Sequence, residues 1–179
     1  MDMKECVRTR RSVRNFAKRP VEQETLRQIV ELAAFAPSWK NSQTARYIAV
    51  FDAEKKHRLA TECTTFAQNA HIMEAAPLVV ALVTVDNRSG YERDGSFSTS
   101  KGTHWQSFDA GIAAQTFCLA AHEAGLGSVI MGLFDEEKAA QVLALPKGMS
   151  ASALIAVGYP AEEPKAPARK SVDDLLHIL

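Results

Sequence analysis

The segment from Phe108 to Ala124 restricts the fold more than any other stretch, because it is apolar around nearly its whole circumference. Its few polar positions are Asp109, Gln115, Thr116, His122 and Glu123. The pattern predicts one long helix, and Gly125 supplies a natural C-terminal stop. A helix that is apolar all round must be buried all round. In a chain of 179 residues we expect a subunit interface to supply part of that cover.

The remaining segments predict a mixture of helices and strands. Apolar residues recur at helical spacing over 22–36, and Pro37 is expected to end that helix. Residues 78–83 form a continuous apolar run rich in β-branched side chains, typical of a strand covered on both faces. Shorter strands are expected at 47–51, 129–131 and 154–159, and further helices at 1–12, 53–76, 136–145 and after Ser171. This order predicts an α+β or α/β fold around one sheet.

Length and composition indicate an ordinary globular domain spanning 1–179. The net charge of zero gives no indication of nucleic acid or of a membrane surface as a partner. The longest apolar stretch, 75–85, is far shorter than the roughly 20 residues of a membrane helix. Three widely spaced cysteines without a CxxC pattern favour reduced thiols. Charged residues follow Met1 directly, unlike a signal peptide, so we expect a cytoplasmic protein.

A basic run is the strongest local feature. Six basic residues and no acidic one lie between Arg8 and Arg19, and Arg10, Arg11 and Arg14 flank a hydroxyl at Ser12. Guanidinium groups bind phosphate through paired donors, so this segment could hold a phosphate. From composition alone a solvated basic segment is the commoner outcome. A nucleic-acid role is disfavoured because Phe16 is the only aromatic residue available for stacking.

Two further loops could contact a ligand. Residues 36–43 follow a helix and offer short amide and hydroxyl groups that could read the edge of a planar heterocycle, although an ordinary turn is the simpler reading. Residues 86–104 form an unusually long connection with three glycines, typical of functional or disordered loops. Residues 125–132 do not form a dinucleotide fingerprint, because they follow a helix and lack the third glycine. The histidines show no metal-ligand spacing, and no GxSxG is present, so we predict neither a metal site nor a catalytic triad.

Taken together, these pieces resemble the nitroreductase-like family of FMN-dependent oxidoreductases. The resemblance rests on the order and spacing of five segments across nearly the whole chain, which are Arg10–Phe16, Ala36–Gln43, Asp109–Gly127, Gly158–Pro160 and Pro167–Arg169. It implies an α+β fold in which helices flank a central, mostly antiparallel sheet. It also implies a homodimer that exchanges its C-terminal segments and binds two FMN molecules at the subunit interface.

The resemblance assigns site residues as well. Arg10, Ser12, Arg14 and Arg169 would hold the phosphate and ribityl chain of FMN, with a contribution from Arg11. A second group would contact the flavin ring. It comprises Ser38, Asn41 and Gln43, partly from the opposite subunit, and the backbone of Met131 and Gly132 near the reactive edge.

The activity implied is the transfer of hydride from NADH or NADPH through FMN to nitroaromatics, quinones or similar planar acceptors. The cofactor supplies this chemistry, so no catalytic residue of the protein is expected. Two alternatives stay open at this point. The chain could be a family member with other flavin chemistry, such as a dehydrogenase or a dehalogenase, or it could be a non-catalytic FMN-binding module.

Overall fold

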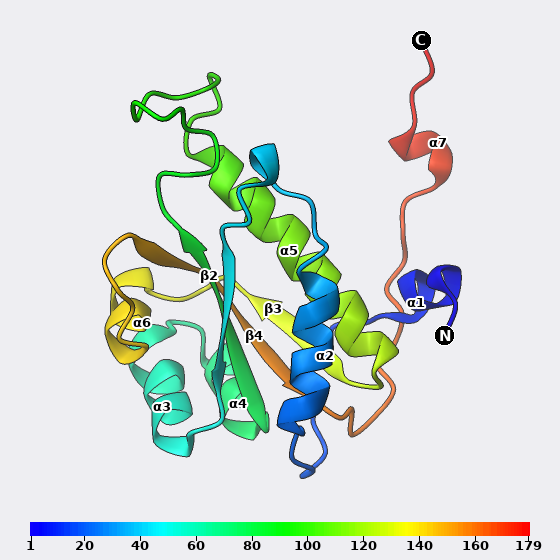
Figure 1. The fold of residues 1–179 in the computed structure, drawn as a ribbon. Helices are drawn as coiled ribbons and strands as arrows, with labels where there is room; N and C mark the ends of the chain where they lie inside the picture. Colours follow the sequence, from blue (N-terminus) through cyan, green and yellow to red (C-terminus); the bar gives the residue numbers. More distant parts are fainter.

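The computed structural model describes all 179 residues, and a four-stranded sheet lies at its centre (Figure 1). The strands are β1 (Ala45–Val50), β2 (Leu78–Val85), β3 (Gly127–Met131) and β4 (Met149–Gly158). They pair in the order β1-β2-β4-β3, and every pairing is antiparallel. The predicted α+β class with an antiparallel sheet is therefore confirmed. β3 lies at one edge of this sheet, and its outer side is free to receive another segment.

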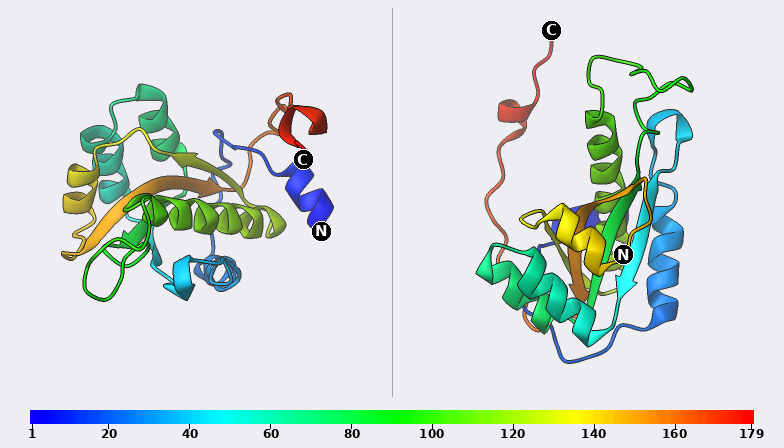
Figure 2. Two further views of the ribbon diagram at one scale, coloured as in Figure 1. Left: turned by 90° about the horizontal axis from the view of Figure 1, so that it is seen from above. Right: turned by 90° about the vertical axis from the view of Figure 1, so that its left-hand side faces the viewer.

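Helices cover both faces of the sheet (Figure 2). On one face lie α2 (Gln23–Ala33) and α5 (His104–Glu123). On the other lie α3 (Ala53–Arg58), α4 (Ala67–Ala75) and α6 (Glu136–Val142), with a π-helical turn, Leu59–Cys63, following α3. The sheet thus separates two apolar cores, one on each side.

β2 contributes to both cores, as the apolar run over 78–83 predicts. Leu78, Val80 and Leu82 pack against α2 and α5, whereas Val79 and Val83 face the other helices. This alternation follows from the two-residue period of a strand. Because both faces are covered, no position of the run needs to be polar.

One side of α5 stays uncovered within the chain. Ala113, Phe117 and Ala121 are buried on the side that faces the sheet and α2. On the opposite side Phe108 is 56% exposed, and Gly111 is exposed too. The single chain therefore buries this helix on one side only, although its sequence is apolar all round. None of the helices combines the length and apolar character needed to cross a membrane.

Several predicted boundaries were wrong by a few residues. α2 ends at Ala33 instead of Ala36, because the N–H groups of Phe35 and Ala36 bond to carbonyls only three residues back, which tightens the last turn. β1 and β3 each begin two residues earlier than expected. β4 begins at Met149, five residues before the predicted start, because Ser150 and Ser152 hide its apolar pattern. α5 likewise begins at His104, before the apolar run that predicted it.

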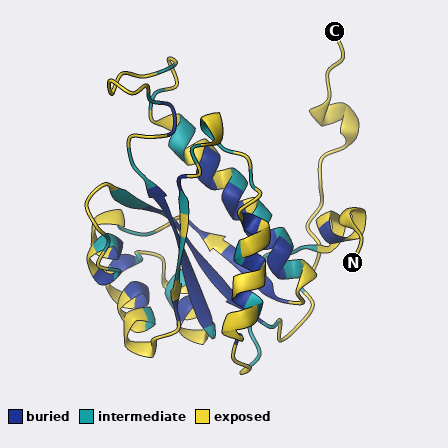
Figure 3. Ribbon diagram, in the orientation of Figure 1, coloured by how far each residue is buried: buried dark blue, intermediate teal, exposed yellow.

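The two ends of the chain lie to one side of the sheet, and the N-terminal end contacts α5, where the Cys6 thiol lies 3.5 Å from the Leu119 carbonyl (Figures 1 and 2). They contain α1 (Met3–Thr9) and α7 (Val172–Leu175), the latter capped by Ser171 as predicted. The C-terminal arm, residues 161–179, is almost entirely exposed (Figure 3). Its apolar side chains share this exposure, with Leu175 at 69% and Ile178 at 88%.

Candidate functional site

The basic N-terminal segment lies along the free edge of β3. Ser12 forms a parallel bridge with Ser128, and the Val13 N–H donates to the Ser128 carbonyl at 3.0 Å. Gly127 permits this approach, since a Cβ there would fall 2.4 Å from Cγ2 of Val13. The fold therefore fixes the backbone of the predicted phosphate-binding residues against the sheet.

The first half of the C-terminal arm runs back to the same place. The Ala17 N–H bonds to the Tyr159 carbonyl at 2.8 Å, and the Ala161 N–H bonds to the Asn15 carbonyl at 3.0 Å. The side chains of Asn15 and Glu162 are hydrogen-bonded as well. These contacts bring Lys165 and Arg169 next to the basic N-terminal segment.

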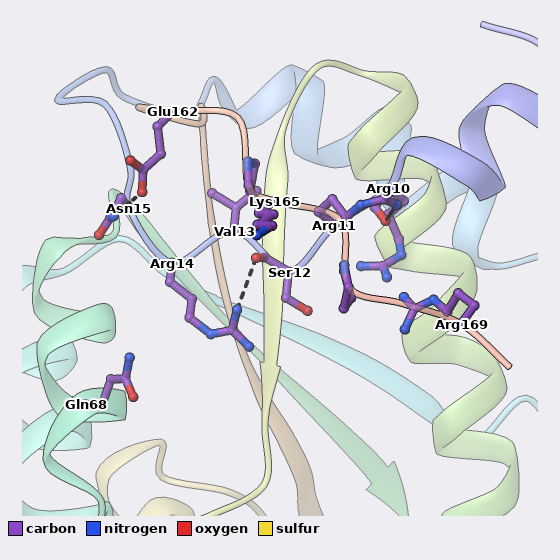
Figure 4. A pocket seen from close by; sticks show the side chains of 12 residues that line it. Arg10, Arg11, Ser12, Val13, Arg14, Asn15, Gln68, Glu162, Lys165 and Arg169 are labelled. Carbon is purple, nitrogen blue, oxygen red and sulfur yellow. Dashed lines mark hydrogen bonds between the residues drawn. The ribbon is translucent and has the colours of Figure 1, made fainter.

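Together the two segments line a cavity of about 580 Å³ (Figure 4). Five of its side chains are cationic, whereas Glu162 is its only carboxylate; the cations are Arg10, Arg11, Arg14, Lys165 and Arg169. Ser12, Asn15 and Gln68 add neutral polar groups. We call this cavity the basic pocket. It brings together five predicted site residues from opposite ends of the sequence.

The cations of the basic pocket are not neutralised by the chain itself. None of the five lies within 4.0 Å of a carboxylate in an ion pair. Arg11 is partly engaged, because its Nη1 donates to the carbonyls of Arg8 and Arg10 at 2.6 and 2.9 Å. Arg14 makes only a long bond of 3.4 Å to the Ser12 carbonyl. The pocket is therefore suited to an anion with several acceptor oxygens, such as a phosphate.

β3 leads from this pocket to the other predicted positions. Its residues Ser128 and Met131 are roughly 10 Å apart, at about 3.3 Å per residue. Met131 is buried with its side chain in the core, so only its backbone can face a ligand. Gly132 is exposed, and its N–H donates to no other group of the chain. An extended ligand could thus reach from the arginines to this free donor.

Gln68 is a lining residue that the sequence analysis missed. It is the second residue of α4, and its side chain points toward the basic pocket (Figure 4). No local pattern marks it, because its relevance comes only from the packing of α4 beside β3. Lys165 lines the pocket too, and it is likewise not among the site residues that the sequence predicts.

Ser38, Asn41 and Gln43 do not reach the basic pocket of their own chain. They lie in the loop before β1, which includes a short 3₁₀ turn, Trp39–Asn41. Ser38 and Gln43 line a separate cavity of about 380 Å³ between α2, β1 and α5. The single chain therefore separates the two groups of predicted flavin contacts.

This loop is strained and holds unpaired polar groups. Asn41 and Gln43 have φ of 53° and 47°, a region that residues other than glycine seldom adopt. Such strain clusters at functional sites. Three of its buried polar atoms lack a hydrogen-bond partner, namely Nε1 of Trp39, Oγ of Ser42 and Oγ1 of Thr44. Buried polar atoms are nearly always paired, so the loop is suited to a polar ligand.

The thiols do not offer a reactive nucleophile. Cys6, Cys63 and Cys118 are free and buried. In each case burial is the main factor that raises the pKa of the thiol, so the reactive thiolate is disfavoured. None of the three thiols is therefore suited to attack a substrate.

Comparison with known proteins identifies this architecture. A model of the nitroreductase family matches residues 7–71 and 66–159. The chain is 31% identical to the NADH dehydrogenase of Thermus thermophilus, over 91% of the chain and 89% of that protein. It is 29% identical to the NADPH-flavin oxidoreductase of Vibrio harveyi, over 97% of the chain and 72% of that protein.

The chain also resembles a solved structure described as a candidate nitroreductase. It is the crystal structure, in complex with FMN, of a protein from Desulfovibrio desulfuricans. The two share 29% identity and superimpose with a TM-score of 0.77, covering 97% of this chain and 94% of the other. With its fold, its ordered sequence segments and the family match over most of its length, the chain belongs to the nitroreductase family.

Proposed function

We propose that residues 1–179 form one FMN-binding domain of a homodimeric oxidoreductase, which transfers hydride from NADH or NADPH through FMN to nitroaromatics, quinones or similar planar acceptors. The observation that supports this most is the convergence of five unneutralised cations, from both ends of the chain, on the basic pocket. The names of the relatives from Thermus thermophilus and Vibrio harveyi, an NADH dehydrogenase and an NADPH-flavin oxidoreductase, agree with it.

The donor set of the basic pocket fits the phosphate of FMN. Arg10, Ser12, Arg14 and Arg169 would bind the phosphate and the ribityl chain, with Arg11 as a further donor. The exposed N–H of Gly132 would donate to the edge of the flavin ring. FMN supplies the redox chemistry, and the protein supplies orientation and hydrogen bonds.

A second copy of the chain would complete the site. The loop 38–43 lies away from its own basic pocket, so we assign its contacts to the flavin held by the partner. The uncovered side of α5 and the apolar C-terminal arm offer the interface, and exchange of the arms would bury Leu175 and Ile178. The three free, buried cysteines favour a reducing compartment, the cytoplasm.

An absorption spectrum tests the proposal directly. We expect the purified protein to be yellow, or to become so with FMN, to bleach when NADPH or NADH is added without oxygen, and to recover with a nitroarene. A colourless protein that takes up no FMN would overturn the proposal. A bound flavin that neither nucleotide reduces would instead favour a non-catalytic module or a different flavin reaction.

A further inference from the structure

Asp109 is a buried carboxylate that faces no cation. Its residue is 4% exposed, and it forms no ion pair with a lysine, arginine or histidine. Instead its two oxygens accept the Trp39 N–H at 3.1 and 3.0 Å, and Oδ2 also accepts the Ser89 hydroxyl at 2.7 Å. Its oxygens are therefore satisfied by hydrogen bonds and not by an ion pair.

Such a group needs an explanation beyond packing. Burial of a carboxylate is unfavourable unless its oxygens are satisfied. An apolar side chain at this position of α5 would pack against the sheet side without that cost. The benefit of the carboxylate must therefore lie in the two donors that it holds.

The two donors belong to different irregular segments. Trp39 is in the strained loop 38–43, next to Ser38. Ser89 lies near the start of the long connection 86–103, which packs tightly against α5, since a Cβ on Gly90 would lie 2.9 Å from that of Trp105. Asp109 thus bonds both segments to the same helix.

Two further contacts hold the loop 38–43, one to Glu92 of the connection and one to Trp105 of α5. Lys40 forms an exposed ion pair with Glu92 at 2.7 Å. The rings of Trp39 and Trp105 lie 4.4 Å apart. Exposed ion pairs contribute little, so the buried bonds of Asp109 are the main restraint on the loop.

We propose that Asp109 is a positioning residue that fixes the loop 38–43 in its strained, ligand-ready conformation and couples it to the connection 86–103. This inference rests on the proposed function, because it takes Ser38 and Asn41 as flavin contacts. Asp109 also lines the cavity of about 380 Å³ beside Ser38 and Gln43. Its effect reaches the loop through the backbone of Trp39.

The test compares Asp109→Asn with the wild type and with Asp52→Asn as a matched control. Asparagine has nearly the same size but carries no charge, and its NH2 group puts a donor in place of one of the two acceptor oxygens, so the bonds from Trp39 and Ser89 lose the carboxylate that strengthens them. Asp52 caps α3 on the opposite face of the sheet by accepting the Lys55 N–H at 2.8 Å, and asparagine caps a helix equally well.

Two readouts separate positioning from overall stability. In the apoprotein, we expect hydrogen exchange of the peptide 36–44 to be faster in Asp109→Asn, while the peptide from β2 stays protected. In the FMN titration, we expect the Kd to rise roughly tenfold or more, the loss expected for hydrogen bonds to a charged group. Asp52→Asn should match the wild type in both.

Unchanged exchange and unchanged FMN affinity in a folded Asp109→Asn protein would overturn the proposal. If that variant does not fold, Ser89→Ala replaces it, because it removes one of the two donors and leaves the carboxylate in place. There we expect exchange at 36–44 to rise severalfold, and an unaltered rate would refute the coupling. If the wild type binds no FMN, the proposed function fails, but the exchange result still tests the restraint on the loop.

Discussion

Ser12 lies beside Ser128 in a parallel bridge, which lays the arginine-rich segment along the free edge of β3. The adjacent residues show how close this contact is. The Val13 N–H bonds to the Ser128 carbonyl, and the Val13 side chain occupies the space where a side chain on Gly127 would be. The geometry of the basic pocket therefore depends on a residue that binds no ligand.

Gly127→Ala should weaken FMN binding by displacing this segment. The new Cβ would meet Val13 at 2.4 Å, so one of the two backbones must move. We expect a loss of about 1–3 kcal/mol in the free energy of unfolding, together with a higher Kd for FMN. Denaturant unfolding and flavin titration measure the two effects.

The double variant Gly127→Ala, Val13→Gly provides the control, because it removes the Cβ and both methyl groups of Val13, which would lie 2.4 to 2.9 Å from the new Cβ. Its combined loss should be smaller than the sum of the two single losses. Simple additivity would contradict the steric explanation.

Neutralising one arginine from each end of the chain should weaken the binding of FMN in the basic pocket. Arg14→Gln and Arg169→Gln each remove a charged donor from the basic pocket. We expect each to cost about 1.5–3 kcal/mol of FMN binding, which is roughly a 10- to 100-fold higher Kd. The comparison is Arg58→Gln, which breaks only a surface pair with Glu62. A loss at Arg14 without one at Arg169 would mean that the arm takes no part in the site.

Substitution on the uncovered side of α5 should separate the subunits. Gly111 is exposed, and a Cβ there would meet no atom of its own chain. In an isolated chain Gly111→Ala would stabilise the helix by up to about 1 kcal/mol. In a dimer packed on this side, Gly111→Arg should instead yield monomers that bind FMN weakly.

Sedimentation with flavin titration measures both properties of the Gly111 variants. Glu31→Arg, on the exposed side of α2, is the matched change and should leave the dimer intact. A dimeric Gly111→Arg protein would exclude this side of α5 as the interface.

His122 should make stability fall in mild acid. Burial, followed by the charges of Arg10 and Arg11, lowers the pKa of His122 below its ordinary value of about 6.5. As the pH falls through 6.5, His122 therefore becomes protonated in the unfolded chain while it is still neutral in the folded chain. The free energy of unfolding should decrease from about pH 7 toward pH 5 and level off below the folded pKa.

His122→Gln retains a donor for Thr9, which lies 2.8 Å from Nε2, but cannot titrate. Urea unfolding at several pH values should show a flatter profile for this variant. An equally steep profile would assign the effect to another group.

The sequence predicts the fold well where a pattern is local. The apolar run at 78–83 predicts a strand between two cores, and Ser171 predicts the N-terminal cap of α7. The prediction fails where polar residues interrupt the apolar pattern of an element, as Ser150 and Ser152 do in β4. Those serines bond to Asp86 and Thr84, which are distant in sequence, so no local pattern reveals their place in a strand.

The residues of the candidate site likewise fall into those that the sequence reveals and those that it does not. Arg10 to Arg14 stand out as a dense cluster, and the family resemblance adds Arg169. Gln68 and Asp109 do not stand out, because each acquires its role from a neighbour more than fifty positions away. Ser38 and Asn41 lie away from the basic pocket of their own chain, so the assignment of these residues to the flavin stays a prediction.

The basic pocket also has a consequence for biosynthesis. Arg169 is the last residue to be translated of all those that line it. A chain still growing on the ribosome can build the sheet and both cores, yet until the arm is made it has only three of the five cations. We therefore expect tight flavin binding only in molecules whose synthesis has passed residue 169.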